Sequence, residues 1–592
     1  MARNTLTLND DGTLDGVQMA IINKRMEAIC AKMANTLLRT GRSGVLNSAR
    51  DFSCCIVTAE NRLLTVNESL PIHVLRGADM MCESMQAFHP DLERGDAYLH
   101  NSPYHGCSHP ADHTTLVPVV DDEGVHRFTM VAKAHQADCG NSIATTYHGS
   151  ARDVYEEGAL IFPAVQIQRD YEDIEDIVRM CRLRIRVPEQ WWGDYLAALG
   201  AARIGEREIL GFGREIGWDT LAQFADQWFD YSEQLMIAAV RKMPGGRAET
   251  TSMHDPFPNA EDGIPVKIVV DVDPDEAMID IDLRDNPDAM PCGLNLSQAC
   301  CESTLLLGVF NSIPEAVPTN TGSFRRVRMH LKENSVCGIP KHPTSCSVAT
   351  TNLADRVGNA VSRAIADLGD GYGMASTASI IPPSLGVISG TSEKTKGAYV
   401  NQIFLGWGGG AASAQADAWL SIGHLGNAGM SYQDSIELDE MRFPLTVRGR
   451  HFITDSGGHG RTRGGAGVYC EFGPTEGDLE VGYVSDGNVT APEGARGGTP
   501  GGRANQFRRD ANGDLHRLDP CAQAIIPEGH TIVSYSCGGG GYGAPTERPA
   551  PQVAIDVRER WVSAEAARET YRVVVDDAGD LDEDATARLR NG

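Results

Sequence analysis

The spacing of hydrophobic residues changes along this chain. Up to residue 245 apolar positions recur every three or four residues over several long segments, which is typical of amphipathic helices. Short apolar runs separated by polar turns lie between these segments and predict strands, some of them paired as hairpins. The predicted helices are 14–41, 71–87, 174–186, 191–216 and 219–242, and the predicted strands are 54–58, 62–66, 115–120, 127–134 and 159–167.

Beyond residue 245 the pattern turns first to strands and then to glycine. Alternating runs at 266–272 and 277–283 predict a hairpin, and 298–310 and 351–368 read as helices, the second with Asn352 as its N-cap. We expect a mixed α/β (α+β) chain with many layers. The first predicted part is a region 1–245 with helices and the hairpin that holds the candidate site described below. It is followed by a mixed region 246–370 with a strand at 327–331, a glycine-rich β region 371–548, and a charged segment 549–592 that is partly helical to 575 and ends as an exposed acidic tail.

Composition narrows the class of protein. With 592 residues, 41% of them hydrophobic, the chain can build several cores. Its net charge of −28 argues against nucleic acid as a partner, and no run of 18 apolar residues offers a membrane span. The N-terminal residues are polar and acidic, unlike a signal peptide. The 15 cysteines are scattered and form no C-x-x-C motif, so we expect reduced thiols in a cytoplasm.

Residues 101–141 predict a hairpin with ligand-forming side chains gathered at one end. Antiparallel pairing of 115–120 with 127–134 across the turn 121–124 places His109 and Asp112 beside His135 and Asp138. An imidazole and a carboxylate at positions i and i+3 can bind one divalent ion, and a third ligand from a neighbouring strand end closes the site. The alternative is a set of loop histidines bound to backbone and water. The stretch holds five of the 17 histidines: His105, His109, His113, His126 and His135.

Glycine-rich motifs in this chain lack the context that nucleotide binding needs. Residues 538–543 fit G-x-G-x-x-G after a strand, but Ala544-Pro545 follows where the fingerprint needs a helix N-terminus. We therefore interpret this run as a tight loop with close backbone approach. The chain contains neither a G-x-x-x-x-G-K-[ST] phosphate loop nor a G-x-S-x-G nucleophile elbow. We predict that this chain alone hydrolyses no ATP.

Several blocks of sequence, in order, match motifs of one known family over most of the chain. In these blocks the chain resembles the hydantoinase B family. That family comprises the B-type subunits of 5-oxoprolinases, N-methylhydantoinases and caprolactamases, and related subunits of acetone and acetophenone carboxylases. It departs from the family pattern at Ser102, Cys107-Ser108 and Gln136, near the expected site. The matching blocks are Arg50-Asp51-Phe52-Ser53, Leu70-Pro71-Ile72-His73, Asn101 to Asp112, Ala134 to Gly140, Glu156-Glu157-Gly158, Asp355-Arg356 and 538–543.

The resemblance implies a divalent metal, namely zinc, manganese or iron, and a hetero-oligomer with an A-type subunit that carries ATP and Mg²⁺ at an actin-like site. The metal ligands that it implies are Asp51, His109, Asp112 and His135. We predict three further site residues. Asp138 would orient a ligand imidazole through its far nitrogen, His73 would lie beside the ligands or instead cap the helix that follows it, and His105 would belong to the catalytic site.

Three functions share these residues. The first is a metal subunit of an ATP-dependent cyclic-amide hydrolase, in which metal-bound water opens a ring amide whose oxygen has been phosphorylated. The second is the same subunit in a biotin-independent ketone carboxylase, where an enolate attacks CO₂ instead. The third is a scaffold without catalytic activity that docks a partner enzyme. We favour the hydrolase, because that activity dominates the family.

Overall fold

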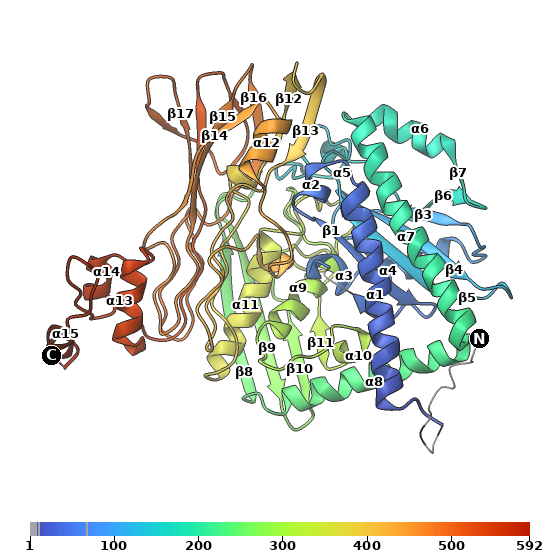
Figure 1. The fold of residues 1–592 in the computed structure, drawn as a ribbon, viewed down its shortest axis with the longest axis horizontal. Coiled ribbons are helices and arrows are strands. Elements are labelled where there is room, and N and C mark those ends of the chain that lie inside the picture. Colours follow the sequence, from blue (N-terminus) through green and yellow to red (C-terminus); the bar gives the residue numbers. More distant parts are fainter. Residues whose placement is uncertain (1–8, 10–11, 67–68, 592) are drawn as a thin grey trace.

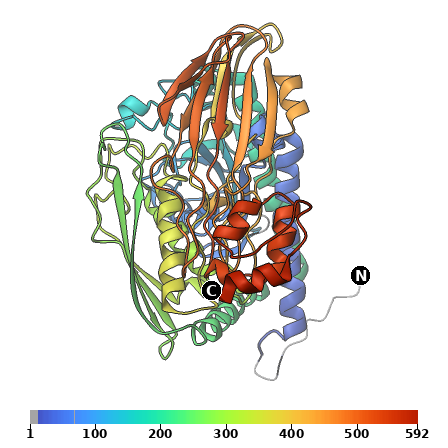
Figure 2. The same ribbon diagram turned by 90° about the vertical axis from the view of Figure 1, so that its left-hand side faces the viewer.

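The computed structural model describes residue 9 and residues 12–66 and 69–591 of the chain. Four β-sheets and the helices between them form one mixed α/β body, from which the C-terminal helices project at one corner (Figures 1 and 2). None of the described helices is long and apolar enough to cross a membrane. All of the cysteines are free, and all but Cys521 are buried.

The largest sheet has seven strands in the order β2-β1-β5-β4-β3-β6-β7. Helices α1 and α7 run side by side across one face (Figure 1), and α3 and α4 pack on the other. Since both faces are covered, β1 and β4 are buried at every position, and their polar residues lie inside the protein as well. The small side chains of α7 allow close packing: Ala201 and Ala202 are fully buried, and a Cβ at Gly205 would meet Met33 of α1.

The elements of this first part are α1 (Gly16–Thr40), α2 (Gly44–Asn47), β1 (Phe52–Thr58), β2 (Leu63–Val66), α3 (Pro71–Val74), α4 (Ala78–Phe88), β3 (Ala97–His100), β4 (Asp112–Val120), β5 (His126–His135), α5 (Val154–Glu157), β6 (Val165–Arg169), β7 (Glu172–Asp173), α6 (Glu175–Arg184), α7 (Pro188–Ile216) and α8 (Trp218–Val240).

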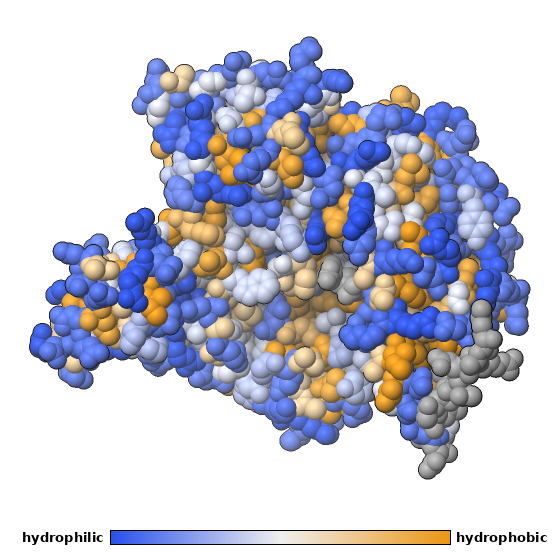
Figure 3. Space-filling view, viewed as in Figure 1, coloured by the Kyte–Doolittle hydropathy of each residue, from blue (hydrophilic) through white to orange (hydrophobic). Residues whose placement is uncertain are grey.

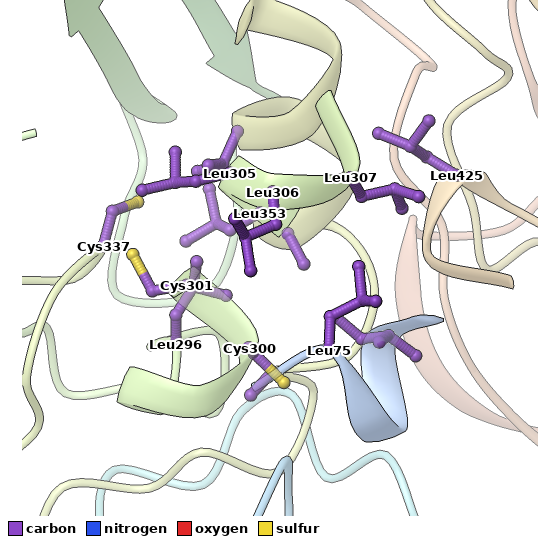
Figure 4. Packing of buried hydrophobic residues seen from close by; sticks show 14 of the residues in the cluster. Leu75, Leu296, Cys300, Cys301, Leu305, Leu306, Leu307, Cys337, Leu353 and Leu425 are labelled. Carbon is purple, nitrogen blue, oxygen red and sulfur yellow. The ribbon is translucent and has the colours of Figure 1, made fainter. Parts of the chain in front are cut away.

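A second sheet has the strand order β11-β10-β9-β8. One of its faces is covered and the other faces solvent, so buried and more exposed residues alternate along β9. Helix α11 packs on the covered face, and α9 lies between α11 and α3, buried along its length. Figure 4 shows leucines of α9 in one apolar cluster with Leu353 of α11 and Leu75, which follows α3, so α9 joins this layer to the helices on the first sheet. The elements are β8 (Gly246–His254), β9 (Ile264–Asp273), β10 (Met278–Asp282), α9 (Gln298–Phe310), α10 (Thr321–Phe324), β11 (Val327–His330) and α11 (Leu353–Leu368).

The C-terminal part contains two antiparallel sheets, β13-β12-β16-β19 and β14-β15-β20-β17-β18, which share an apolar core around Ile388, Phe472 and Ile532. On the face shown in Figure 3, apolar residues form separate patches among polar ones. The elements are η1 (Pro383–Leu385), β12 (Val387–Ser392), β13 (Gly397–Gln402), η2 (Leu425–Asn427), α12 (Ile436–Arg442), β14 (Leu445–Phe452), β15 (Val468–Pro474), β16 (Leu479–Val484), β17 (Asn505–Arg509), β18 (Leu515–Arg517), β19 (Cys521–Ile526), β20 (Thr531–Tyr535), η3 (Pro545–Glu547), α13 (Ala550–Arg558), α14 (Ala564–Glu569) and α15 (Glu583–Asn591).

Four glycine-rich segments, 406–410, 457–467, 494–502 and 538–543, hydrogen-bond to one another through their backbones; we call them the glycine bundle. The Gly458 amide donates to the Gly539 carbonyl at 2.8 Å, and the Gly539 amide donates to Gly465 at 3.0 Å. A Cβ on Gly539 would lie 1.8 Å from the Gly410 oxygen, so only glycine fits there. The close backbone approach expected at 538–543 is confirmed, and no α-helix follows this run before α13.

Two predicted elements have different bounds because of close contacts. The helix predicted over 71–87 is two helices, since Gly77 has φ +108° and a Cβ there would lie 2.5 Å from the Gly106 oxygen. The strand predicted over 159–167 begins only at Val165. Before it, the Asn101 side chain bonds the backbone of Leu160 and Phe162 and takes the place of a neighbouring strand.

Two further expectations at helix ends hold only in part. Asn352 occupies the N-cap position of α11, as predicted, but its side chain makes no capping hydrogen bond: Asn352 has φ +48°, and its amide nitrogen lies 3.1 Å from both His254 Nε2 and the Val484 oxygen. The acidic C-terminus is not only a tail, because α15 forms there and Arg590 donates to the Arg548 carbonyl at 2.8 Å. Neither long-range contact has a local signal in the sequence.

Candidate metal centre

The register of the β4–β5 hairpin places Asp112 directly opposite His135. Directly opposite residues in antiparallel strands point to the same face of a sheet, so the two side chains meet. His109 reaches them from the turn before β4, where the Asp112 amide donates to the His109 carbonyl at 3.1 Å. The hairpin therefore brings His135 beside His109 and Asp112, which precede it by 26 and 23 residues.

Three potential donor atoms converge in this buried cluster. His109 Nε2 lies 3.0 Å from Asp112 Oδ1 and 3.2 Å from His135 Nδ1, and the last two atoms are 3.3 Å apart. A tetrahedral ion with ligand bonds of about 2.1 Å would hold its donors about 3.4 Å from one another. The spacing and the nitrogen and oxygen donors both fit a divalent ion such as zinc, manganese or iron.

Both imidazoles are held by their second nitrogen. His109 Nδ1 donates to the Ser347 carbonyl at 2.9 Å, which leaves Nε2 with a lone pair toward the cluster. The far nitrogen of His135 lies 3.2 Å from the Thr146 hydroxyl, and the Tyr147 ring stacks on the His135 ring. Such contacts fix ring orientation at metal sites. Burial is the largest single influence and opposes the protonation of His109, but the charge and hydrogen bond of Asp112, the Ser347 carbonyl and the charge of Asp51 together leave the pKa of His109 raised.

Asp51 lies at the edge of this cluster. It precedes β1, and its carbonyl accepts the His135 amide at 3.1 Å, so the strand pairing places it beside His135. Its carboxylate accepts no hydrogen bond from any described residue, although the side chain is only 11% exposed. Burial raises the pKa of Asp51, and the negative charge of Asp112 raises it further. A buried carboxylate without a donor is what a nearby cation would satisfy.

His73, on α3, faces both carboxylates. Its Nε2 lies 3.3 Å from Asp112 Oδ2 and 3.6 Å from Asp51 Oδ1. Its Nδ1 lies 3.2 Å from the Ser53 hydroxyl, which accepts the Leu70 amide and so has its own proton to donate to Nδ1. This network places the ring proton on Nε2, and burial lowers the pKa of His73 to about 3. A neutral ring with its proton toward the carboxylates supports them but offers the cluster no lone pair.

The structure does not bring the other two predicted site residues into the cluster. Asp138 does not orient His135, because its carboxylate accepts the Arg186 amide and guanidinium at 2.6 and 2.9 Å, and Thr146 takes the expected place. His105 is half-buried, with Nδ1 2.8 Å from the Ser102 hydroxyl and its ring edge-on to Phe88. It makes no hydrogen bond to the cluster within the described part of the chain.

Comparison with known proteins decides the family. The sequence model of the Hydantoinase B/oxoprolinase family matches residues 15–545.

The chain belongs to the hydantoinase B/oxoprolinase family.

Its relatives include enzyme subunits of matching length. The chain is 27% identical to the beta subunit of the caprolactamase of Pseudomonas jessenii over 97% of this chain and 98% of that one. It is 25% identical to the B-type subunit of a putative D-/L-hydantoinase of Pseudomonas sp. (strain NS671), over 98% of each. The 5-oxoprolinase of Saccharomyces cerevisiae is 22% identical over 90% of this chain, but only 42% of the yeast protein is covered.

Solved structures show the same fold. The ATP-dependent caprolactamase of Pseudomonas jessenii superposes with a TM-score of 0.87 at 24% identity, covering 98% of this chain and all of that one. A nucleotide-free acetone carboxylase gives 0.88 at 17% identity, covering 98% of this chain and 82% of that one. The mixed α/β fold expected from the sequence is thereby confirmed.

The sequence analysis did not identify several buried polar groups near the β4–β5 hairpin. Glu157 is 1% exposed, accepts the Ser345 hydroxyl at 2.6 Å, and has its pKa raised by burial to about 7. His424 Nδ1 lies 3.0 Å from Asp355 Oδ1, on a turn that packs against α3. Lys133 is buried two residues before His135. Its position was a usable signal, because alternation along β5 points both side chains to the same face.

Proposed function

We propose that this chain is the metal-binding subunit of an ATP-dependent cyclic-amide hydrolase of hydantoin, 5-oxoproline or lactam type, acting with an A-type ATP-binding subunit in the cytoplasm. The main observation behind this proposal is that potential ligand atoms of His109, Asp112 and His135 all lie within 4.8 Å of one another in a buried cluster. Full-length similarity to the beta subunit of a caprolactamase and the B-type subunit of a putative hydantoinase supports a role beside another subunit. The absence of a phosphate-loop motif supports placing ATP on the partner.

In this proposal Asp51, His109, Asp112 and His135 hold the ion. When bound, a divalent ion supplies a Lewis acid for the carbonyl and lowers the pKa of water. The chain's own groups do the positioning: the Ser347 carbonyl and Thr146 hold the two imidazoles, and neutral His73 donates toward Asp112. Burial raises the pKa of Tyr147, so its ring stays neutral and covers His135 from one side.

The proposed reaction begins with transfer of a phosphoryl group from ATP to the amide oxygen, at the partner's site. Water then adds to the activated carbon and the ring C–N bond breaks, so that the nitrogen leaves with a proton and an acyl phosphate remains. A second water then hydrolyses the acyl phosphate to the carboxylate and free phosphate. We favour hydrolysis over ketone carboxylation because likeness to the acetone carboxylase rests on fold at 17% identity, whereas the caprolactamase subunit matches at 27% over nearly the whole chain.

The test is co-purification of this chain with the A-type subunit encoded beside it, followed by ATP hydrolysis assays with hydantoins, lactams, 5-oxoproline and ketones. We expect ATP turnover that depends on both subunits and on a cyclic amide. Stimulation by ketone and bicarbonate alone would favour the carboxylase. Saturable ATP turnover by the isolated chain would contradict the division of labour.

A further inference from the structure

Lys133 is fully buried, which is rare for a lysine side chain. Its side chain belongs to β5, is 1% exposed, and lies on the same sheet face as His135. The thiols of Cys55, Cys107 and Cys300 are close enough for its charge to lower their pKa values against the effect of burial. A buried ammonium group is costly unless charge and hydrogen bonds compensate it, so its partners identify what it does.

Among the residues that the structure describes, the side chain of Lys133 hydrogen-bonds to one hydroxyl, which also contacts the proposed metal ligand Asp112. Lys133 Nζ donates to Ser108 Oγ at 2.9 Å, and Ser108 Oγ donates to Asp112 Oδ2. A hydroxyl has one proton to donate, and the lysine, which has only donors, requires that proton to point to Asp112. The Ser108 carbonyl is itself held by the Ser297 hydroxyl at 2.6 Å, which fixes the loop.

The two oxygens of Asp112 therefore have different surroundings. Oδ2 receives Ser108 and faces His73 Nε2 at 3.3 Å, whereas Oδ1 faces His109 and His135. We propose that Lys133, acting through Ser108, positions Asp112 as a one-oxygen metal ligand and balances the charge of the paired carboxylates Asp51 and Asp112. This inference rests on the metal site of the proposed function.

Substitutions at Lys133 and Ser108 can separate this positioning role from a role in packing. Lys133→Met keeps the side chain's length and removes the ammonium group, which leaves the buried carboxylates without that compensating charge and should lower the stability of the metal-free chain. Ser108→Ala removes the hydroxyl, while Ser108→Thr keeps it. If the lysine only filled space, Met would do so equally well and metal binding would not change.

The experiment measures Zn²⁺ affinity by competition with a chelator, and the visible absorption of Co²⁺ as a report on coordination, in the full chain. We expect Lys133→Met and Ser108→Ala to weaken Zn²⁺ binding by about 10- to 100-fold, as loss of outer-sphere partners does, and to alter the Co²⁺ bands. Ser108→Thr should restore both. Lys267→Met, at a partly buried position on β9 outside the cluster, should leave both unchanged.

Wild-type affinity and spectrum in Lys133→Met and Ser108→Ala would overturn the inference while leaving the proposed function intact. If Lys133→Met does not fold, the Ser108 pair still decides it. A wild-type chain that binds neither Zn²⁺ nor Co²⁺ would overturn the metal site itself, and this inference with it.

Discussion

Two regions of this molecule carry residues that suggest a ligand, and only one has polar groups left to bind it. At the end of the β4–β5 hairpin, side-chain nitrogens and oxygens converge, and the Asp51 carboxylate has no hydrogen-bond donor among the described residues. In the glycine bundle, backbone groups such as the Gly539 amide and carbonyl are paired with other segments of the same bundle. A motif indicates binding only where its polar groups are not already satisfied by the fold.

The largest expected effect is in the glycine bundle. Gly539→Ala should abolish folding or cost more than about 4 kcal/mol, because the new Cβ would meet backbone at 1.8 Å. The control is Gly200→Ala, on α7, where a Cβ meets nothing within 4 Å and helix propensity improves. Soluble yield and thermal melting measure both. A Gly539→Ala protein that melts like wild type would remove the architectural role of this run.

At the hairpin, His109→Ala and Asp112→Ala should each remove the metal and the activity and leave the fold largely intact. Removing one ligand opens the shell, and bound metal should fall below about a tenth of an equivalent. The control is His126→Gln, at the other end of the same hairpin, where Nε2 contacts the Thr129 hydroxyl. Elemental analysis beside a thermal melt measures the outcome. Full metal and wild-type turnover in His109→Ala would show that this hairpin is not the active site.

Glu157 should make stability depend on pH. Burial raises its pKa from 4.5 to about 7, so the folded chain keeps a proton that the unfolded chain loses. The contribution of Glu157 to the free energy of unfolding is fully present below pH 4.5 and is lost as pH rises through 7. The loss is at most about 1.4 kcal/mol per pH unit. Glu157→Gln should therefore lose less stability than wild type between pH 5 and pH 8, measured by melting in chelator. Glu156→Gln, at the neighbouring position, which is only partly buried, should behave like wild type. Equal losses in all three proteins would argue against a protonated Glu157.

The smallest effect is expected at Gln136. This position departs from the family's second histidine, and its side chain bonds the Ala134 carbonyl at 3.1 Å. If its side chain points away from His135, as strand alternation predicts, Gln136→His should retain metal with less than about a threefold change in affinity, well below the loss of an outer-sphere partner. Competition titration with Zn²⁺ measures this. A tighter site with altered Co²⁺ bands would show that position 136 reaches the ion.

Local pattern explains what could be predicted here. Alternation and turn chemistry were enough to place His109 and Asp112 beside His135, because antiparallel register follows from the hairpin itself. The Asp138 partner was not predictable in that way, since Arg186 lies 48 residues further on. The break at Gly77 likewise depends on Gly106 and Ala299, which only the packed fold brings near.

The hydrogen bond from His109 to the Ser347 carbonyl joins positions 238 residues apart. A ribosome adds roughly 5–20 residues per second, so Ser347 is made roughly 10–50 s after His109. During that time the hairpin can form, but the His109 ring has no fixed tautomer. The order of synthesis thus delays a finished metal site until more than half of the chain exists, and a metal ion offered to the nascent chain should bind less tightly than one offered to the complete protein.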